Sequence, residues 1–217
     1  MTAEIIYSDD DLLVVNKPAG TSSTAGGWGQ EAPSLAKQLE TDFGRVWTIH
    51  RLDKGTSGLI VFARNPAAHR AISMLFERRQ IVKTYHALVC GLPLWEQASS
   101  RLPLRADVGH SHRTAVDQQR GAPALTRFHV LERFSAQVLL SAAPETGRTH
   151  QVRAHAAALG FPILADRLYG APPTELIPRP ALHAYSLELS FRGQAFTWTA
   201  CYPPDFANAL DQLRAGR

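Results

Sequence analysis

A dense run of polar and charged residues, HRLDKGTSG at positions 50–58, lies directly before an apolar stretch. Gly55 and Gly58 permit backbone geometries that other residues avoid, so the run predicts a tight, defined loop. Asp53, held on such a loop beside cationic neighbours, would stay ionised and could serve as a nucleophile or a base. The alternative is an aspartate that only hydrogen-bonds its own turn, which is the commoner role of loop aspartates.

A second polar run, ETGRTHQVRAH, occupies positions 145–155. Thr149 is a candidate N-cap for a helix over residues 149–159, which places Arg148 just before that helix. Helix N-termini attract anions, so Arg148 could pair with a phosphate or with a catalytic carboxylate.

Other polar residues give weaker signals. His150 and His155 lie five apart and point to different sides of a helix, which favours structural histidines over a metal pair. The glycines at 26–29 have no preceding strand and no following Lys-Ser/Thr, so they indicate no phosphate loop. Ser57 lies in no G-x-S-x-G elbow, so no hydrolase nucleophile is indicated.

Tyr85 alternates like a strand residue and could face a core or offer a ring on which a base stacks.

The elements that must position these residues follow from hydrophobic periodicity and turn residues. Strands are expected at residues 5–7, 12–16, 59–63, 84–89, 124–131, 137–142, 182–191 and 194–201. Helices are expected from Ser34, with Leu35, Leu39 and Phe43 on one face, and at residues 66–79, 149–159 and 203–213. Residues 91–123 are expected to form loop and a short hairpin. Strands outnumber helices, which favours an α+β fold with a large, mainly antiparallel sheet.

Composition excludes several classes of protein. The 217 residues suffice for one large domain or two small lobes, and 45% apolar with 19% charged residues excludes disorder as the main state. No apolar run approaches the roughly 20 residues that span a bilayer, and the N-terminus has no signal-peptide pattern. Two cysteines without a CxxC pattern argue against a zinc ribbon or a disulfide scaffold and fit a reducing cytoplasm.

Charge is distributed unevenly. Arginine supplies 19 of the 23 basic residues, and six arginines with three histidines lie between Arg101 and Arg133 against three acids. The planar fork of arginine suits phosphates and bases, which favours a phosphate-binding face. A GC-rich genome that favours arginine codons would give the same composition, so composition alone leaves both interpretations open.

In this order, the motifs resemble those of the RluA-type pseudouridine synthases. HRLDKGTSGL at residues 50–59 is similar to the family's catalytic motif, KTY at 83–85 to its tyrosine motif, and GRTHQVRAH at 147–155 to the motif whose first arginine pairs with the aspartate. The resemblance runs from about residue 4 to about residue 205. Ala165 departs from it, because the family more usually has glycine at that position.

The resemblance implies a pseudouridine-synthase-like catalytic domain over residues 1–217, in one or two lobes, with a large mixed, mainly antiparallel sheet flanked by helices and a central RNA-binding cleft. We expect no appended N-terminal RNA-binding domain, because the resemblance already begins at about residue 4. The reaction would convert a flipped-out uridine of structured RNA, ribosomal RNA or tRNA, to pseudouridine without a metal, a nucleotide cofactor or any other cofactor. We further expect a cytoplasmic monomer.

The resemblance also implies roles for individual residues. Asp53 would be the essential carboxylate, Tyr85 would stack on the flipped uracil, and Arg148 would hold the carboxylate ionised. Arg51 would fill the space that the base vacates. The expected RNA contacts are Arg51, His50, Thr56, Arg113 and Arg153.

Two alternatives remain at this stage. A glycosidase normally needs a second carboxylate, for which Glu145 is the candidate. A catalytically inactive RNA-binding homologue would share the basic surface, although the presence of Asp53, Tyr85 and Arg148 argues against it.

Overall fold

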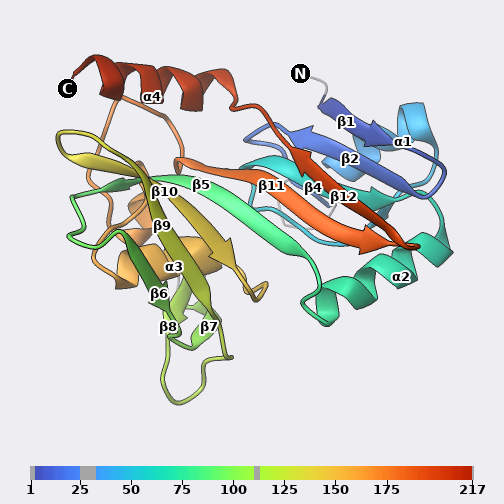
Figure 1. The fold of residues 1–217 in the computed structure, drawn as a ribbon, viewed down its shortest axis with the longest axis horizontal. Coiled ribbons are helices and arrows are strands. Elements are labelled where there is room, and N and C mark those ends of the chain that lie inside the picture. The colour runs from blue at the N-terminus through green and yellow to red at the C-terminus, as the bar shows by residue number, and fades with distance from the viewer. Residues whose placement is uncertain (1–2, 25–32, 110–112, 217) are drawn as a thin grey trace. The chain divides into compact units, whose positions relative to one another are not determined.

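The computed structural model describes residues 3–24, 33–109 and 113–216 (Figure 1). The chain divides into two compact units, the first made of residues 1–82 and 184–201 and the second of residues 83–183 and 202–217. Within the described residues, no helix is long and apolar enough to cross a membrane.

The first unit is built on a buried antiparallel sheet. Its strands are β1 (Glu4–Ser8), β2 (Leu12–Lys17), β3 (Trp47–Thr48), β4 (Ser57–Ala63), β11 (Leu182–Phe191) and β12 (Gln194–Thr199). The apolar runs of β2 and β4 are buried on both faces, and the two strands pair antiparallel with Leu12 opposite Ala63. Strands β11 and β12 form the expected hairpin.

Two helices complete this unit. In α1 (Leu35–Phe43), the Ser34 side chain accepts a hydrogen bond from the Lys37 N–H, as its N-cap position predicts. In α2 (Pro66–Glu77), Asn65 caps the helix in the same way and proline takes the first helical position. Helix α2 buries Ala68 and Ile72 in a core that includes Val61 of β4.

The second unit contains a further antiparallel array. Its strands are β5 (Val82–Cys90), β6 (Gln97–Ser100), β9 (Thr126–Arg133) and β10 (Gln137–Pro144), with β7 (Leu104–Val108) and β8 (Arg113–Val116) as a separate two-stranded sheet. Helices α3 (Gln151–Ala158) and α4 (Pro204–Ala215), with the 3-10 turn η1 (Arg167–Tyr169), complete it. Side chains of β5, β10, α3 and α4 share one hydrophobic core.

The α+β class and the antiparallel pairing are confirmed, and three local predictions need correction. Residues 91–123 hold three strands where loop and one hairpin were expected, because β6 is a short polar strand at the edge of β9. Strand β9 begins two residues later than predicted. Helix α3 begins at Gln151, and its N-cap is His150 in the left-handed conformation instead of Thr149.

Candidate active site

The backbone around Asp53 is fixed by hydrogen bonds from the segment that follows β2. The Ser23 hydroxyl donates to the Leu52 carbonyl and accepts from the Leu52 N–H, both at 3.1 Å. The Gly20 N–H donates to the Lys54 carbonyl at 2.7 Å, and the Thr56 N–H donates to the Asp53 carbonyl at 3.0 Å. Asp53 itself is half-buried. The predicted tight loop is thus confirmed. The sequence did not predict its contacts with Gly20 and Ser23.

A fully buried lysine supports the same loop. The Lys17 side chain is 0% exposed, and its ammonium donates to the carbonyls of Pro18 at 3.0 Å, Thr21 at 2.9 Å and Lys54 at 3.4 Å. A buried charge is tolerated only when its hydrogen-bonding capacity is met, as it is here. Lys17 therefore joins the end of β2 to the loop of Asp53.

Gly58 lets this loop enter β4 in close contact with β11. Its φ is +111°, and a Cβ at this position would lie 2.2 Å from the backbone oxygen of Ala184. Only glycine satisfies both the positive φ and the close approach of the two backbones. The prediction that Gly58 shapes the loop is confirmed.

The predicted RNA contacts of this loop occupy three different environments. Arg51 is exposed, so it is accessible to RNA. Thr56 is 2% exposed, and the Nε2 atom of His50 accepts the Val61 N–H at 3.0 Å while its ring stacks on Phe76. These contacts give His50 and Thr56 structural positions in the loop, and their contact with RNA stays a prediction.

In the second unit, Tyr85 lies on β5 opposite Ala142 of β10. It is half-buried and packs against the hydrophobic core. The side chain thus contacts the core, which was one alternative, and stays partly accessible, which stacking on a base would need. Its neighbour Lys83 donates to the Thr146 carbonyl at 3.4 Å, and burial lowers the pKa of this lysine. Lys83 thereby connects β5 to the segment that carries Arg148.

The segment before α3 is organised by Gln151. Its side-chain oxygen accepts from the Thr146 hydroxyl at 2.7 Å and from the Arg148 N–H at 3.0 Å, while its amide nitrogen donates to the Leu125 carbonyl and the Thr126 hydroxyl. The Arg148 side chain is exposed, and its Nε donates to the Pro123 carbonyl at 3.2 Å. Arg148 thus has a fixed backbone and a solvent-exposed guanidinium.

The two histidines of this segment have hydrogen-bond partners, as predicted. His155 is fully buried, with Nδ1 2.9 Å from the Thr126 hydroxyl and Nε2 2.9 Å from the Leu102 carbonyl. His150 lies with Nδ1 3.2 Å from the Tyr169 hydroxyl. In the part of the chain that the structure describes, no cluster of three or more His, Cys, Asp or Glu residues could hold a metal ion.

Arg153 is buried, unlike Arg148. Its Nε and Nη2 atoms donate to the two carboxylate oxygens of Asp166 at 2.7 and 2.8 Å, and its guanidinium lies 5.1 Å from the ring centre of Tyr169. Such a bidentate pair fixes both the position and the plane of the guanidinium. The Arg153 side chain is only 10% exposed, and its predicted contact with RNA stays a prediction.

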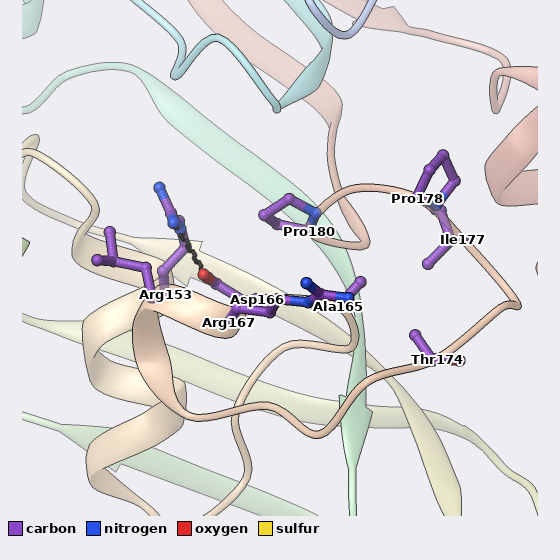
Figure 2. A pocket seen from close by; sticks show the side chains of 9 residues that line it. Arg153, Ala165, Asp166, Arg167, Thr174, Ile177, Pro178 and Pro180 are labelled. Carbon is purple, nitrogen blue, oxygen red and sulfur yellow. Dashed lines mark hydrogen bonds and ion pairs between the residues drawn. The ribbon is translucent and has the colours of Figure 1, made fainter.

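The Arg153–Asp166 pair borders a cavity of about 450 Å³ in the second unit. In Figure 2 the ion pair lies on the left of the cavity, and Thr174, Ile177 and Pro178 lie on the right. A volume of this size lies in the range of ligand pockets, which are about 300–1,000 Å³. The cavity therefore places a buried cation beside a space that could admit part of a ligand.

Glu145, the second carboxylate that a glycosidase would need, lies on the surface. Its Oε1 accepts from the Arg127 Nε at 2.6 Å, and both side chains are exposed. Because this carboxylate is exposed and paired with Arg127, its position does not favour it as the second carboxylate of a glycosidase.

The family model for RNA pseudouridylate synthase matches residues 11–158, a span that contains the loop of Asp53, strand β5 and the segment before α3. The chain belongs to this family. An RNA pseudouridylate synthase is an isomerase that converts uridine to pseudouridine within RNA, so the resemblance inferred from the motifs is confirmed.

Individual relatives of this RNA pseudouridylate synthase agree in sequence and in fold. The dual-specificity RNA pseudouridine synthase RluA of Escherichia coli (strain K12) is 37% identical over 206 residues, 93% of each chain. RluA of Pasteurella multocida (strain Pm70) is 40% identical over 193 residues, 87% of this chain and 86% of the relative. The structure of human RNA pseudouridylate synthase domain containing 1 aligns with a TM-score of 0.80 at 28% identity, over 98% of this chain and 93% of that chain.

Sequence reasoning missed three residues that fix the two candidate segments: Lys17 in the first unit, and Gln151 and Asp166 in the second. All three lie within the span that resembles the family, and Gln151 lies within the motif at residues 147–155. No local pattern indicated that Gln151 would be buried with four hydrogen bonds.

Proposed function

We propose that this RNA pseudouridine synthase modifies uridines in more than one structured RNA, ribosomal RNA and tRNA, with Asp53 as its essential carboxylate. The Escherichia coli relative that is named a dual-specificity synthase matches over 93% of its own length, which supports a comparably broad substrate range here. We further propose that the protein acts as a monomer in the cytoplasm. Both of its cysteines are free, which agrees with a reducing compartment.

The main support for this proposal is the set of hydrogen bonds that fixes the backbone of the loop of Asp53. In the isomerisation, the bond from the ribose C1′ to N1 of uracil breaks and a bond from C1′ to C5 forms. C5 loses a proton and N1 gains one, so the composition of the nucleoside is unchanged. A carboxylate that takes part in this exchange must be held at a fixed position while the base rotates. The hydrogen bonds to Leu52, Asp53 and Lys54 supply that fixed position, and the half-buried side chain stays accessible.

The target uridine must leave its stack in RNA before reaction, at a cost of a few kcal/mol. In the proposal, the exposed Arg51 fills the space that the base leaves, and the ring of Tyr85 at the edge of the core stacks on the flipped uracil. The exposed arginines of the second unit, Arg113 among them, bind the RNA backbone.

The first experiment compares wild-type protein with Asp53→Asn on unmodified ribosomal RNA and tRNA transcripts, with nucleosides separated by chromatography because the isomerisation leaves mass unchanged. We expect a pseudouridine peak from the wild type, a loss of at least about a thousandfold in Asp53→Asn, and RNA affinity within about threefold. Asp10→Asn, an exposed turn aspartate of the same unit, is the matched control and should keep full activity. Full activity of Asp53→Asn would refute the assignment.

The arginine that pairs with the Asp53 carboxylate needs a second experiment. The motif assigns this role to Arg148, whereas Arg153 is the buried arginine of the same motif and already pairs with Asp166. Arg148→Lys and Arg153→Lys keep the charge and remove the fork. If Arg148 carries the role, its variant loses more turnover at equal RNA affinity; the reverse order assigns the role to Arg153.

A further inference from the structure

The hydroxyl of Tyr169 binds both backbone polar atoms of one residue in the β7–β8 hairpin. The Thr114 N–H donates to the Tyr169 hydroxyl at 3.0 Å, and that hydroxyl donates to the Thr114 carbonyl at 3.0 Å. Burial is the largest cause that raises the pKa of Tyr169, so the phenol stays protonated and remains a donor. A side chain thus supplies the bonds that a neighbouring strand would supply in a larger sheet.

This contact matters because the hairpin is a separate two-stranded sheet. An isolated two-stranded hairpin is marginally stable in water and needs other packing to hold it. Its first strand is anchored through Leu104, which packs with Ala124 and Ala154 and against Tyr169. Its second strand is anchored at Thr114, whose side chain is 1% exposed.

Strand alternation connects this anchor to the surface. Side chains at successive strand positions point to opposite faces, so the burial of Thr114 turns its neighbour Arg113 toward solvent. Arg113 is exposed in the structure, as an RNA-contacting arginine must be. The position of Arg113 therefore depends on how β8 is held at Thr114.

The other side of Tyr169 contacts the buried arginine. The Arg153 guanidinium lies 5.1 Å from the ring centre, an arrangement that stabilises a cation over an aromatic face. The hydroxyl also lies 3.2 Å from His150 Nδ1, at the N-cap of α3. One side chain thus touches the hairpin, the start of α3 and Arg153.

We propose that Tyr169 is a positioning residue: its hydroxyl holds β8 so that Arg113 is presented to RNA, and its ring holds Arg153 in place. The inference rests on the proposed RNA role of the second unit's arginines. It assigns separate effects to two parts of one side chain, which makes it testable by two substitutions.

The experiment measures kcat and KM of the full chain on an RNA substrate. Tyr169→Phe keeps the ring and removes the hydroxyl, so we expect KM to rise about fivefold and kcat to stay within about twofold. Tyr169→Leu removes the ring as well, so kcat should also fall, by about tenfold. Tyr7→Phe is the matched control, because it removes a hydroxyl hydrogen bond to Asp9 in the first unit and should change neither constant.

A double-mutant cycle tests the link to Arg113. Arg113→Ala should raise KM, and adding Tyr169→Phe should raise it little further, because both changes remove the same contact with RNA. Independent, multiplicative effects on KM would overturn the inference, as would an unchanged KM in Tyr169→Phe.

Hydrogen exchange separates this inference from the proposed function, since it needs no RNA. In Tyr169→Phe the amides of residues 113–116 should exchange at least about fivefold faster, while those of the β11–β12 hairpin in the first unit keep their rates. Unchanged exchange of β8 overturns the positioning role whatever the activity. If exchange is faster but Arg113→Ala leaves KM unchanged, Tyr169 does hold β8, and the RNA role of Arg113 is refuted.

Discussion

In the loop that carries Asp53, the groups that fix the backbone are mostly backbone atoms, one serine hydroxyl and the ammonium of Lys17. In the segment from residue 146 to residue 170, they are the side chains of Gln151, His155 and Asp166. The first arrangement depends on the path of the chain and on glycine. The second depends on the chemical identity and protonation of individual side chains.

This difference affects how each region responds to change. Backbone hydrogen bonds tolerate changes in pH and in most side chains, but they fail where a Cβ does not fit. A network of buried side chains depends instead on every partner, because each lost partner leaves a buried polar group unsatisfied. A substitution can therefore disrupt the side-chain network of residues 146–170 and leave the loop of Asp53 intact, or the reverse.

Asp166→Asn should have the largest effect. It removes the charge that pairs with the buried Arg153, and breaking one side of a buried ion pair costs about 3–5 kcal/mol. We expect the free energy of unfolding to fall by that amount in urea denaturation. Glu145→Gln, which breaks the exposed pair with Arg127, is the control and should change stability by less than about 1 kcal/mol. A small effect of Asp166→Asn would mean that Arg153 is satisfied without its partner.

Gly58→Ala should have the next largest effect and acts on the first region. The added Cβ would lie 2.2 Å from the Ala184 backbone oxygen at a φ of +111°, so β4 and β11 must shift apart. Overpacking costs about 1–3 kcal/mol and the left-handed backbone about 1 kcal/mol more, so a loss of about 3 kcal/mol is expected in the same assay. Gly20→Ala, also at positive φ but with nothing within 4 Å, isolates the backbone contribution. Equal losses in both variants would contradict the steric account.

The sequence predicted most elements because their patterns are local. The apolar runs of β2 and β4, the cap Ser34 and the β11–β12 hairpin are each encoded within a few residues. Ordered motifs also identified the loop of Asp53 and strand β5. Strand β6 escaped prediction because Gln97–Ser100 has no apolar alternation, and its strand state depends on pairing with β9.

The sequence did not predict which polar side chains of these motifs are buried. Arg148 and Arg153 are five residues apart in one motif, and nothing local indicates that one is exposed while the other pairs with Asp166. His50 and Thr56 share a polar run with Asp53, yet their positions depend on contacts with β4 and on packing. Side-chain roles in this site are therefore tertiary properties.

Acid should weaken the second unit through His86. This histidine is buried, with Nδ1 2.5 Å from the Tyr202 hydroxyl, and burial lowers its pKa to about 4. The unfolded chain, with a histidine pKa of about 6.5, binds the proton first, so stability falls as pH drops below about 6.5 and levels off below about 4. Between about pH 7 and pH 5.5 this amounts to about 1 kcal/mol. His86→Gln should flatten this part of a stability–pH curve, and a curve as steep as that of the wild type would assign the effect elsewhere.

Ala165→Gly should have the smallest effect, in the opposite direction. Ala165 has a φ of +63°, a conformation in which a Cβ is strained and which glycine adopts freely. Glycine removes that strain, which stabilises the protein by about 1–2 kcal/mol. Its greater freedom in the unfolded chain lowers the stability by about 0.5–1 kcal/mol. The net gain of about 0.5 kcal/mol should appear as a slightly higher denaturation midpoint with an unchanged denaturant slope. Because Ala165 precedes Asp166, a loss of stability would show instead that the methyl group helps to hold the ion pair in the side-chain network.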